Sequence, residues 1–300
     1  MKNLLKLMDL SEKEIVEILN TADQLKFEKK NGIPHRLLEG KVLGLIFAKS
    51  STRTRVSFEV GMFDLGGTSL FLSSRDLQIG RGEIVQDTAR VLSRYLDGIM
   101  IRTFDQREVE ALAEFGTIPI INGLTDYCHP CQVLADLMTI REYKGNIKGR
   151  KLCYIGDGNN MTNSLIVGGI KLGMEVSVAC PAGYEPDADI MKWAHESGRF
   201  SCSPDVLEMA QNSDVLYTDV WASMGQEGEA EERKKVFKSY QINDKVLSVS
   251  KSDAMVLHCL PAHREEEITS KVFEEHSREI FDEAENRLHA QKAVLVKCLL

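Results

Sequence analysis

The sequence predicts an α/β protein built from two doubly wound parallel-sheet domains that are joined by interdomain helices. From residue 41 onward, short and fully apolar runs alternate with segments of helical length, which is typical of parallel sheets covered on both faces. The alternation starts twice in the same way, at 41-KVLGLIFAKSSTRT-54 and at 151-KLCYIGDGNN-160. A chain of 300 residues is also long enough for two domains of ordinary size.

A capping box, Ser11 with Glu14, starts the first predicted helix, whose apolar positions recur at helical spacing until 31-NGIP-34. The segment 130–145 also predicts a helix, because Pro130 suits a first turn and Gly145 suits a helix end. Seven apolar runs predict strands, at 42–47, 98–101, 118–121, 152–156, 175–180, 214–219 and 254–260.

We place the domain boundary near the end of the helix 130–145, which gives a first domain at 1–145 and a second domain at 146–282. The tail 283–300 predicts a last helix with an apolar end, and it could pack on either domain. The charge run 227-EGEAEERKKVFK-238 is expected to be a solvated loop or helix.

Composition argues against several classes of protein. The net charge of -8 disfavours binding to nucleic acids or to membrane surfaces, because both require a basic face. The seven cysteines are odd in number and mostly lie in apolar runs, as reduced buried thiols do, so we expect a cytoplasmic protein. No segment approaches about eighteen apolar residues, and we expect neither a targeting signal nor a membrane span.

The loop 49-KSSTRTR-55 has the composition of an anion site at a helix N-terminus. Ser51 or Thr52 can cap the helix that follows, and the free N–H groups and the helix dipole there favour an anion. Arg53 and Arg55 add guanidinium groups whose planar fork fits phosphate oxygens. The alternative is an ordinary cap whose arginines pair with surface carboxylates. The buried face of this helix is predicted at Val56, Val60 and Phe63.

Two further groups in the first half could serve the same site. Arg102 ends a predicted strand, and the carboxyl ends of strands line the ligand crevice of a doubly wound sheet. His129 and Gln132 lie three residues apart at a helix start, where both can contact a carbonyl or an amide. Arg102 could instead be a solvated loop arginine, and His129 could have only a structural role at the helix start. Cys128 and Cys131 form a C-x-x-C without a second pair, so we expect no metal or redox function there.

The second half carries a loop, 156-GDGNNM-161, that matches a dinucleotide fingerprint for three positions and then has Met161 where a small residue is required. The strand 175–180 ends in Cys180 rather than in an acid for a ribose hydroxyl, so we do not expect a nicotinamide cofactor. Asn159 and Asn160 could offer amides to a small zwitterion. Asp219, at a strand end, could hold an ammonium group.

Together these segments resemble the aspartate/ornithine carbamoyltransferase family, closely and along nearly the whole chain, and within it the ornithine-specific members. Cys131 and the Ser223-Met224-Gly225 triplet stand where aspartate-specific members have other residues, so ornithine is the favoured second substrate. Glu265 departs from the family, which usually has glycine there, and puts the local turn in doubt. The resemblance is carried by 51-STRTR-55, Arg102, 129-HPCQ-132, 219-DVWASMG-225 and 258-HCLP-261, together with 78-QIGRGE-83 and 87-DTARVLSRY-95.

The resemblance implies a complete site and no cofactor or metal. Catalytic roles fall to Arg102, His129, Asp219 and Cys259, of which Cys259 could otherwise be a buried structural cysteine. Ornithine would contact Asn160, Asp219, Ser223 and Met224. Carbamoyl phosphate would contact Ser51, Thr52, Arg53, Thr54, Gln78, Arg102, His129, Gln132, Cys259, Leu260 and Arg287. The family also implies trimers, and a C-terminal helix that returns to the first domain.

The reaction implied is attack of the neutral δ-amine of ornithine on the carbonyl carbon of carbamoyl phosphate, with phosphate leaving and citrulline forming. Arginine synthesis and arginine breakdown both remain open as its context. An alternative is transfer to another amine, such as putrescine, N-acetylornithine or aspartate. A second alternative is a non-catalytic relative that only binds carbamoyl phosphate.

Overall fold

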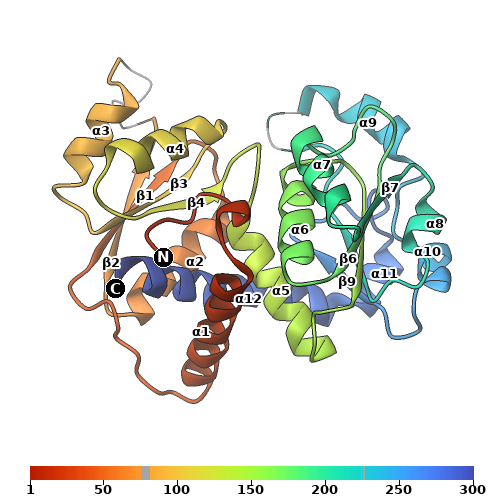
Figure 1. The fold of residues 1–300 in the computed structure, drawn as a ribbon, viewed down its shortest axis with the longest axis horizontal. Helices are drawn as coiled ribbons and strands as arrows, with labels where there is room; N and C mark the ends of the chain where they lie inside the picture. The colour runs from red at the N-terminus through yellow and green to blue at the C-terminus, as the bar shows by residue number, and fades with distance from the viewer. Residues whose placement is uncertain (76–81, 224, 226) are drawn as a thin grey trace. The chain divides into compact units, whose positions relative to one another are not determined.

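A computed structural model describes residues 1–75, 82–223, 225 and 227–300, so Gln78 and Met224 of the predicted site lie outside the described residues. The chain forms two compact units (Figure 1). Unit 1 comprises Met1–Met138 and Asn286–Leu300, and unit 2 comprises Thr139–Glu285. The division falls inside helix α5 (Pro130–Lys144) and inside helix α12 (Ser277–Leu299), whereas the sequence reading placed it near the end of the first of these. Residues 130–140 are all buried, so no polar linker marks the change of unit.

Unit 1 contains a four-stranded sheet in the order β2-β1-β3-β4, and every neighbouring pair is parallel. Its strands are β1 (Val42–Phe47), β2 (Thr68–Ser73), β3 (Gly98–Arg102) and β4 (Ile120–Leu124). Its helical segments besides parts of α5 and α12 are η1 (Leu7–Asp9), α1 (Glu12–Lys30), α2 (Thr52–Asp64), α3 (Val85–Leu92) and α4 (Gln106–Phe115). The predicted capping box at Ser11 is present at the start of α1.

Unit 2 contains a five-stranded sheet in the order β7-β6-β5-β8-β9, again parallel throughout. Its strands are β5 (Lys151–Ile155), β6 (Glu175–Ala179), β7 (Phe200–Ser203), β8 (Val215–Thr218) and β9 (Met255–His258). Its helical segments are α6 (Asn160–Lys171), α7 (Ala188–Glu196), α8 (Val206–Ala210), η2 (Glu227–Glu229), α9 (Ala230–Phe237), α10 (Asp244–Val249) and α11 (Ser270–Glu275). The predicted fold class is confirmed.

Each sheet has a point where the strand order reverses, and ligands of doubly wound folds bind at such points. In unit 1, β1 lies between β2 and β3, so the reversal lies at the carboxyl ends of β1 and β3. In unit 2, β5 lies between β6 and β8, so the reversal lies at the carboxyl ends of β5 and β8. The loop 48–51 and Arg102 stand at the first point, and the loop 156–159 and Asp219 stand at the second.

The buried face predicted for α2 is wrong. Val56 is 50% exposed and Phe63 is 79% exposed, whereas Phe58 and Met62 are fully buried. The stripe that packs inward runs through Thr54, Phe58, Gly61 and Met62, and it therefore turns the buried Thr54 away from solvent. Gly61 permits this packing, because a Cβ there would lie 3.3 Å from Cγ of Lys292 on α12. None of the helices in the described part of the chain combines the length and apolar character that a membrane span requires.

Candidate functional site

The N-terminus of α2 forms the centre of a half-site in unit 1. Ser51 is the N-cap, and its Oγ accepts a hydrogen bond from the Thr54 amide at 3.2 Å. The Ala48 amide donates to the Arg102 carbonyl at 2.8 Å, which holds the loop after β1 against the end of β3. The predicted anion loop and Arg102 are therefore neighbours. The Ser51 hydroxyl proton and the helix dipole can both act on an anion placed there.

Cationic side chains converge on the buried His129, which precedes α5. Burial lowers the pKa of His129 well below its usual value of 6.5, and the charges of Arg287, Arg102 and Arg53 lower it further. Arg102 and Arg287 are themselves buried. A cluster of like charges with little access to water is unfavourable unless an anion neutralises it. His129 thus remains a neutral hydrogen-bond donor among guanidinium groups that are suited to a multiply charged anion.

Arg287 links three elements of unit 1. Its Nη1 donates to Oε1 of Gln132 at 2.6 Å, and its Nη2 donates to Oγ1 of Thr54 at 3.1 Å. The Gln132 amide also donates through Nε2 to Oδ1 of Asp136 at 2.9 Å. Both ends of the Gln132 amide are thus engaged, and its orientation is fixed. The geometry places Arg287, which lies far along the chain from the other members, beside the first turn of α2.

A cavity of about 300 Å³ lies beside the same loop. Its lining includes Ser51 and Thr52, with Phe71 of β2 and Arg55 on other sides. Arg55 stacks its guanidinium 3.8 Å from the centre of the Phe71 ring, and its Nε donates to Oε1 of Glu59 at 2.9 Å. These contacts fit a supporting role for Arg55. The lining does not include Arg102, His129 or Arg287, so the cavity adjoins the start of α2 without containing the buried cationic groups of the half-site.

Cys128 and Cys131 behave as buried neutral thiols. Burial raises the pKa of each to about 12, so neither is a thiolate at neutral pH. The sulfur of Cys131 instead donates to the Asn122 carbonyl at 3.4 Å, within the core of unit 1.

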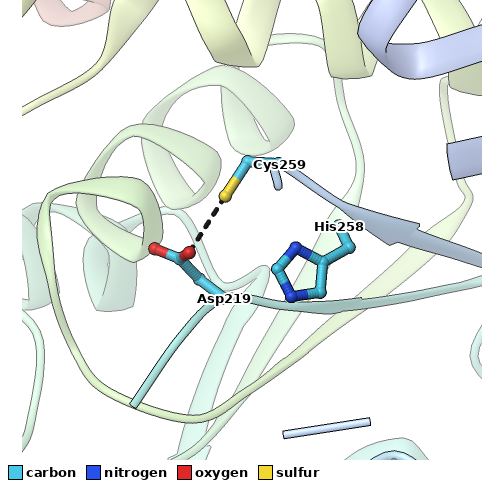
Figure 2. Close-up of side chains that lie close together, drawn as sticks. All are labelled: Asp219, His258 and Cys259. Carbon is cyan, nitrogen blue, oxygen red and sulfur yellow. Dashed lines mark hydrogen bonds between the residues drawn. The ribbon is translucent and has the colours of Figure 1, made fainter. Parts of the chain in front are cut away.

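Unit 2 contains a second half-site, centred on Asp219. Its Oδ1 accepts from Sγ of Cys259 at 3.1 Å and from the Val220 amide at 2.8 Å, and Figure 2 shows the carboxylate and the thiol pointing toward each other. Its Oδ2 accepts from Nδ2 of Asn159 at 2.9 Å. Asn159, predicted as a possible substrate ligand, therefore orients Asp219 and also caps α6 through Oδ1. Asn160 is the first residue of α6, beside this cap.

The structure explains why the loop 156–158 resembles a dinucleotide fingerprint. A Cβ on Gly158 would lie 2.3 Å from the backbone of Glu185 and Pro186, so glycine is required by the packing of the loop 184–186. Gly156 has a φ of 141°, which only glycine adopts readily. Both glycines thus have structural reasons that involve no pyrophosphate.

Arg233 on α9 is a site component that the sequence reasoning missed, because its segment was predicted to be solvated. Its side chain is buried, and Nη1 donates to Oδ2 of Asp157 at 2.8 Å and to the Trp221 carbonyl at 3.0 Å. It thereby ties the loop after β8, which carries Ser223, to the loop after β5. Phe237, one helical turn later, is also buried, and this i, i+4 spacing is the signal that could have revealed an inward face.

Two groups of side chains in the described residues bring three potential metal ligands together. In the group Asp219, His258 and Cys259, His258 already accepts from the Leu260 amide through Nδ1 and bonds Glu267 through Nε2. In the group His263, Glu266 and Glu267, Lys234 pairs with Glu266 at 2.9 Å. A metal ion would have to displace these partners in either place.

Glu265 keeps the turn for which the family usually uses glycine. Its φ is 68°, in the left-handed region that disfavours a side chain, but its Oε1 accepts from the Ser270 amide at 2.8 Å at the start of α11. Hydrogen bonding from Ser270, first by its side chain and then by its backbone amide, lowers the pKa of Glu265, so the interaction is present at neutral pH and is lost as the pH falls below the ordinary value of 4.5.

We therefore expect Glu265→Ala to lower Tm more than Glu265→Gly does, since alanine loses the hydrogen bond and keeps the unfavourable φ. Thermal unfolding of the two variants and the parent at neutral pH measures both effects. Equal Tm values for the alanine and glycine variants would show that the backbone is not strained at this position.

The lowered pKa of His129 predicts that this residue does not titrate near neutral pH. We expect the ratio of kcat/KM for the anionic substrate between the parent protein and His129→Gln to stay constant from about pH 6 to about pH 8, because glutamine has no titrating group. Taking the ratio cancels the titration of the substrates. A ratio that falls as the pH is lowered through 6.5 would mean that His129 gains a proton there.

The fold and these residues define a two-unit α/β protein of doubly wound parallel sheets, with one half-site at the switch point of each sheet. Comparison with protein families makes this specific. The model of the carbamoyl phosphate-binding domain of aspartate/ornithine carbamoyltransferases matches residues 2–142, and the model of the aspartate/ornithine-binding domain matches residues 148–298. The chain belongs to the aspartate/ornithine carbamoyltransferase family.

Individual relatives agree over the full length. The chain is 55% identical to an ornithine carbamoyltransferase of Pyrococcus abyssi, with 99% of this chain and 96% of the relative covered. It is 55% identical to a Pyrococcus furiosus protein named as an anabolic ornithine carbamoyltransferase, with 98% and 95% covered. A solved structure of ornithine carbamoyltransferase from Pyrococcus furiosus superposes with a TM-score of 0.94 at 56% identity, covering 98% of this chain and 96% of that one.

Proposed function

We propose that the protein transfers the carbamoyl group of carbamoyl phosphate to the δ-amine of L-ornithine, which gives L-citrulline and phosphate. The observation that carries the proposal is that the buried Arg102 adjoins the loop before α2 and the buried Arg287 bonds Thr54 and Gln132, while their charges and that of Arg53 lower the pKa of the buried His129. This arrangement suits a phosphate dianion attached to a carbonyl group that accepts a hydrogen bond. The relatives named as ornithine carbamoyltransferases support ornithine as the acceptor.

In unit 1, the phosphate is bound by the start of α2 and its guanidinium neighbours. Arg102 contacts both the phosphate and the carbonyl oxygen, and His129 donates a hydrogen bond to that oxygen without adding charge. Negative charge that develops on the oxygen in the tetrahedral intermediate is stabilised by donors already in place. The full set proposed for carbamoyl phosphate is Ser51, Thr52, Arg53, Thr54, Gln78, Arg102, His129, Gln132, Cys259, Leu260 and Arg287.

In unit 2, Asp219 receives an ammonium group of ornithine, and Asn160, Ser223 and Met224 complete the binding of that substrate. The attacking δ-amine has to be neutral, although a free alkylamine is mostly protonated near pH 7. Attack forms the C–N bond, and collapse of the intermediate breaks the bond from the carbonyl carbon to the phosphate oxygen. The proton that the amine loses goes to the departing phosphate or to the Asp219 and Cys259 pair.

A panel of amines tests the assignment of the acceptor. Purified protein is incubated with carbamoyl phosphate and, in turn, ornithine, putrescine, N-acetylornithine or aspartate, and the carbamoylated product is quantified. We expect the highest kcat/KM with ornithine. A preference for another amine would contradict the acceptor, and no product with any amine would contradict catalysis. Arg53→Ala is the matched control for the donor site and should lose turnover through loss of carbamoyl phosphate binding.

We further propose a homotrimer. Apolar side chains remain exposed on unit 1, including Leu70 and Phe71 on the edge strand β2, Phe63 on α2, and Tyr95, which is 74% exposed. Exposed apolar residues next to an unpaired sheet edge are typical of surfaces that another chain covers. Light scattering should give three times the chain mass of 33.7 kDa. A value equal to one chain would contradict the assembly.

The cellular context is proposed as biosynthetic and cytoplasmic. The relative named as anabolic supports the direction toward citrulline. The cytoplasmic location rests on the odd number of cysteines and on their placement in apolar runs, as for reduced buried thiols.

A further inference from the structure

Leu260 has a backbone conformation that leucine rarely adopts. Its φ is 57°, in the left-handed region where a side chain is disfavoured, so the surrounding structure has to hold it there. The Leu260 amide donates a hydrogen bond to Nδ1 of His258 at 2.9 Å. Leu260 directly follows Cys259, whose thiol donates to Asp219. The backbone conformation at Leu260 therefore sets where Cys259 and Leu260 lie at this end of the half-site.

The ring of His258 is itself fixed from its other side. Both His258 and Glu267 are buried, and Nε2 of His258 lies 3.0 Å from Oε1 of Glu267. Because Nδ1 accepts the amide proton of Leu260, the hydrogen of the neutral ring is on Nε2 and is donated to Glu267. The His258 amide is also held, since it donates to Oε2 of Glu283 at 2.9 Å. Glu267 thus determines the tautomer that makes Nδ1 an acceptor.

We propose that Glu267 and His258 are positioning residues for carbamoyl transfer. Glu267 accepts a hydrogen bond from Nε2–H of His258, and Nδ1 of His258 accepts one from the Leu260 amide, so that together they hold Leu260 in its conformation. His258 lies beside the Asp219 and Cys259 pair in Figure 2, and its Nδ1 accepts from the backbone amide of Leu260, so we assign its effect on the reaction to the backbone. The inference rests on the proposed assignment of Cys259 and Leu260 to the reacting end of the substrates.

Two substitutions of His258 separate its two hydrogen bonds. In His258→Asn, the side-chain oxygen can occupy the place of Nδ1 and accept from Leu260, but the side chain is too short to reach Glu267. In His258→Gln, the amide nitrogen can occupy the place of Nε2 and donate to Glu267, but a methylene group faces the Leu260 amide. We expect kcat to fall about 100-fold in the glutamine variant and at most about 10-fold in the asparagine variant.

The ranking of the two variants distinguishes positioning from a structural role alone. Both substitutions break one buried hydrogen bond, so thermal unfolding should rank them similarly, whereas kcat should not. Equal kcat values, or a lower kcat for asparagine, would overturn the proposal. KM for ornithine should change little in the asparagine variant, because Asp219 and Asn159 are untouched.

A second pair tests Glu267 and guards against variants that fail to fold. Oε1 of Glu267 accepts both described hydrogen bonds, from His258 and from the His263 amide, while Oε2 has no hydrogen-bond partner among the described residues. Glu267→Gln keeps an oxygen for both donors and should retain kcat within about 3-fold, whereas Glu267→Leu should lower it about 100-fold. A glutamine variant as impaired as the leucine variant would contradict the proposal.

A measurement without substrates separates this inference from the proposed function. In protein labelled with 15N-histidine, the ring nitrogens of His258 should show a neutral ring with the hydrogen on Nε2, identified by loss of that signal in His258→Gln. A hydrogen on Nδ1 would overturn the arrangement whatever the enzyme's substrate. If the tautomer is as expected and the parent transfers carbamoyl groups, but His258→Gln keeps full kcat, then the link from Leu260 to the reaction is wrong and the proposed function stands.

Discussion

Arg102→Ala is expected to lower kcat/KM for carbamoyl phosphate by about 1000-fold or more, because one buried guanidinium would serve both the phosphate and the developing oxyanion. Arg102 ends β3 beside the loop that starts α2, and it is one of the charges that keep His129 neutral. Arg102→Lys should recover only part of the loss, since an ammonium group cannot reproduce the planar fork. Steady-state kinetics with carbamoyl phosphate varied at saturating ornithine measures both variants.

Arg107→Ala provides the control in the same unit. Arg107 is exposed at the start of α4 and pairs with Asp105, so its loss should leave kcat/KM unchanged. The unliganded Arg102→Ala protein should not be less stable to heat than the parent, because removing one of several clustered like charges relieves repulsion. An Arg102→Ala variant with normal kcat/KM would refute the assignment of the anion site.

Asp219→Asn is expected to lower kcat/KM for ornithine by about 100-fold while KM for carbamoyl phosphate stays within about 2-fold. The substitution removes the charge that would hold the substrate ammonium. It also leaves Asp219's three donors, namely Asn159, Val220 and Cys259, with a single acceptor oxygen. Kinetics with ornithine varied at saturating carbamoyl phosphate measures the effect.

Asp253→Asn is the matched control in unit 2. Asp253 is exposed and pairs with Lys144, so neutralising it should leave both KM values unchanged. If Asp219→Asn instead raised KM for carbamoyl phosphate and left that for ornithine unaltered, the division of ligands between the two units would be wrong.

The central strands could be predicted from the sequence because they are covered on both faces. All seven predicted strands are present, and the two described strands that were missed, β2 and β7, each lie at one of the two edges of their sheet. Their sequences, 68-TSLFLS-73 and 200-FSCS-203, mix polar and apolar residues, and these two strands are partly exposed, whereas the other two edge strands, β4 and β9, are buried. A search for fully apolar runs does not detect such strands. For α2, the sequence reading assigned apolar residues to the buried face, but Val56 and Phe63 are exposed, and the predicted face was therefore wrong.

The positions of Arg102, His129 and Asp219 at strand ends or at a helix start could be predicted, and their roles stay predictions. What could not be predicted was how they support one another. Asn159 orients Asp219, and Glu267 fixes the ring of His258. Arg233 connects the loop after β5 to the loop after β8, although the two loops lie far apart in the sequence. These partners come from different elements, and only the folded chain brings them together.

The most direct test is a crystal structure of the protein with a non-hydrolysable phosphonate analogue of carbamoyl phosphate. The predicted result places the phosphonate oxygens within hydrogen-bonding distance of Ser51, Thr52, Arg53 and Thr54, with the amide end toward Arg102 and His129. A phosphonate bound at the loop 156–160 of unit 2, with the start of α2 unoccupied, would contradict the assignment of the anion site.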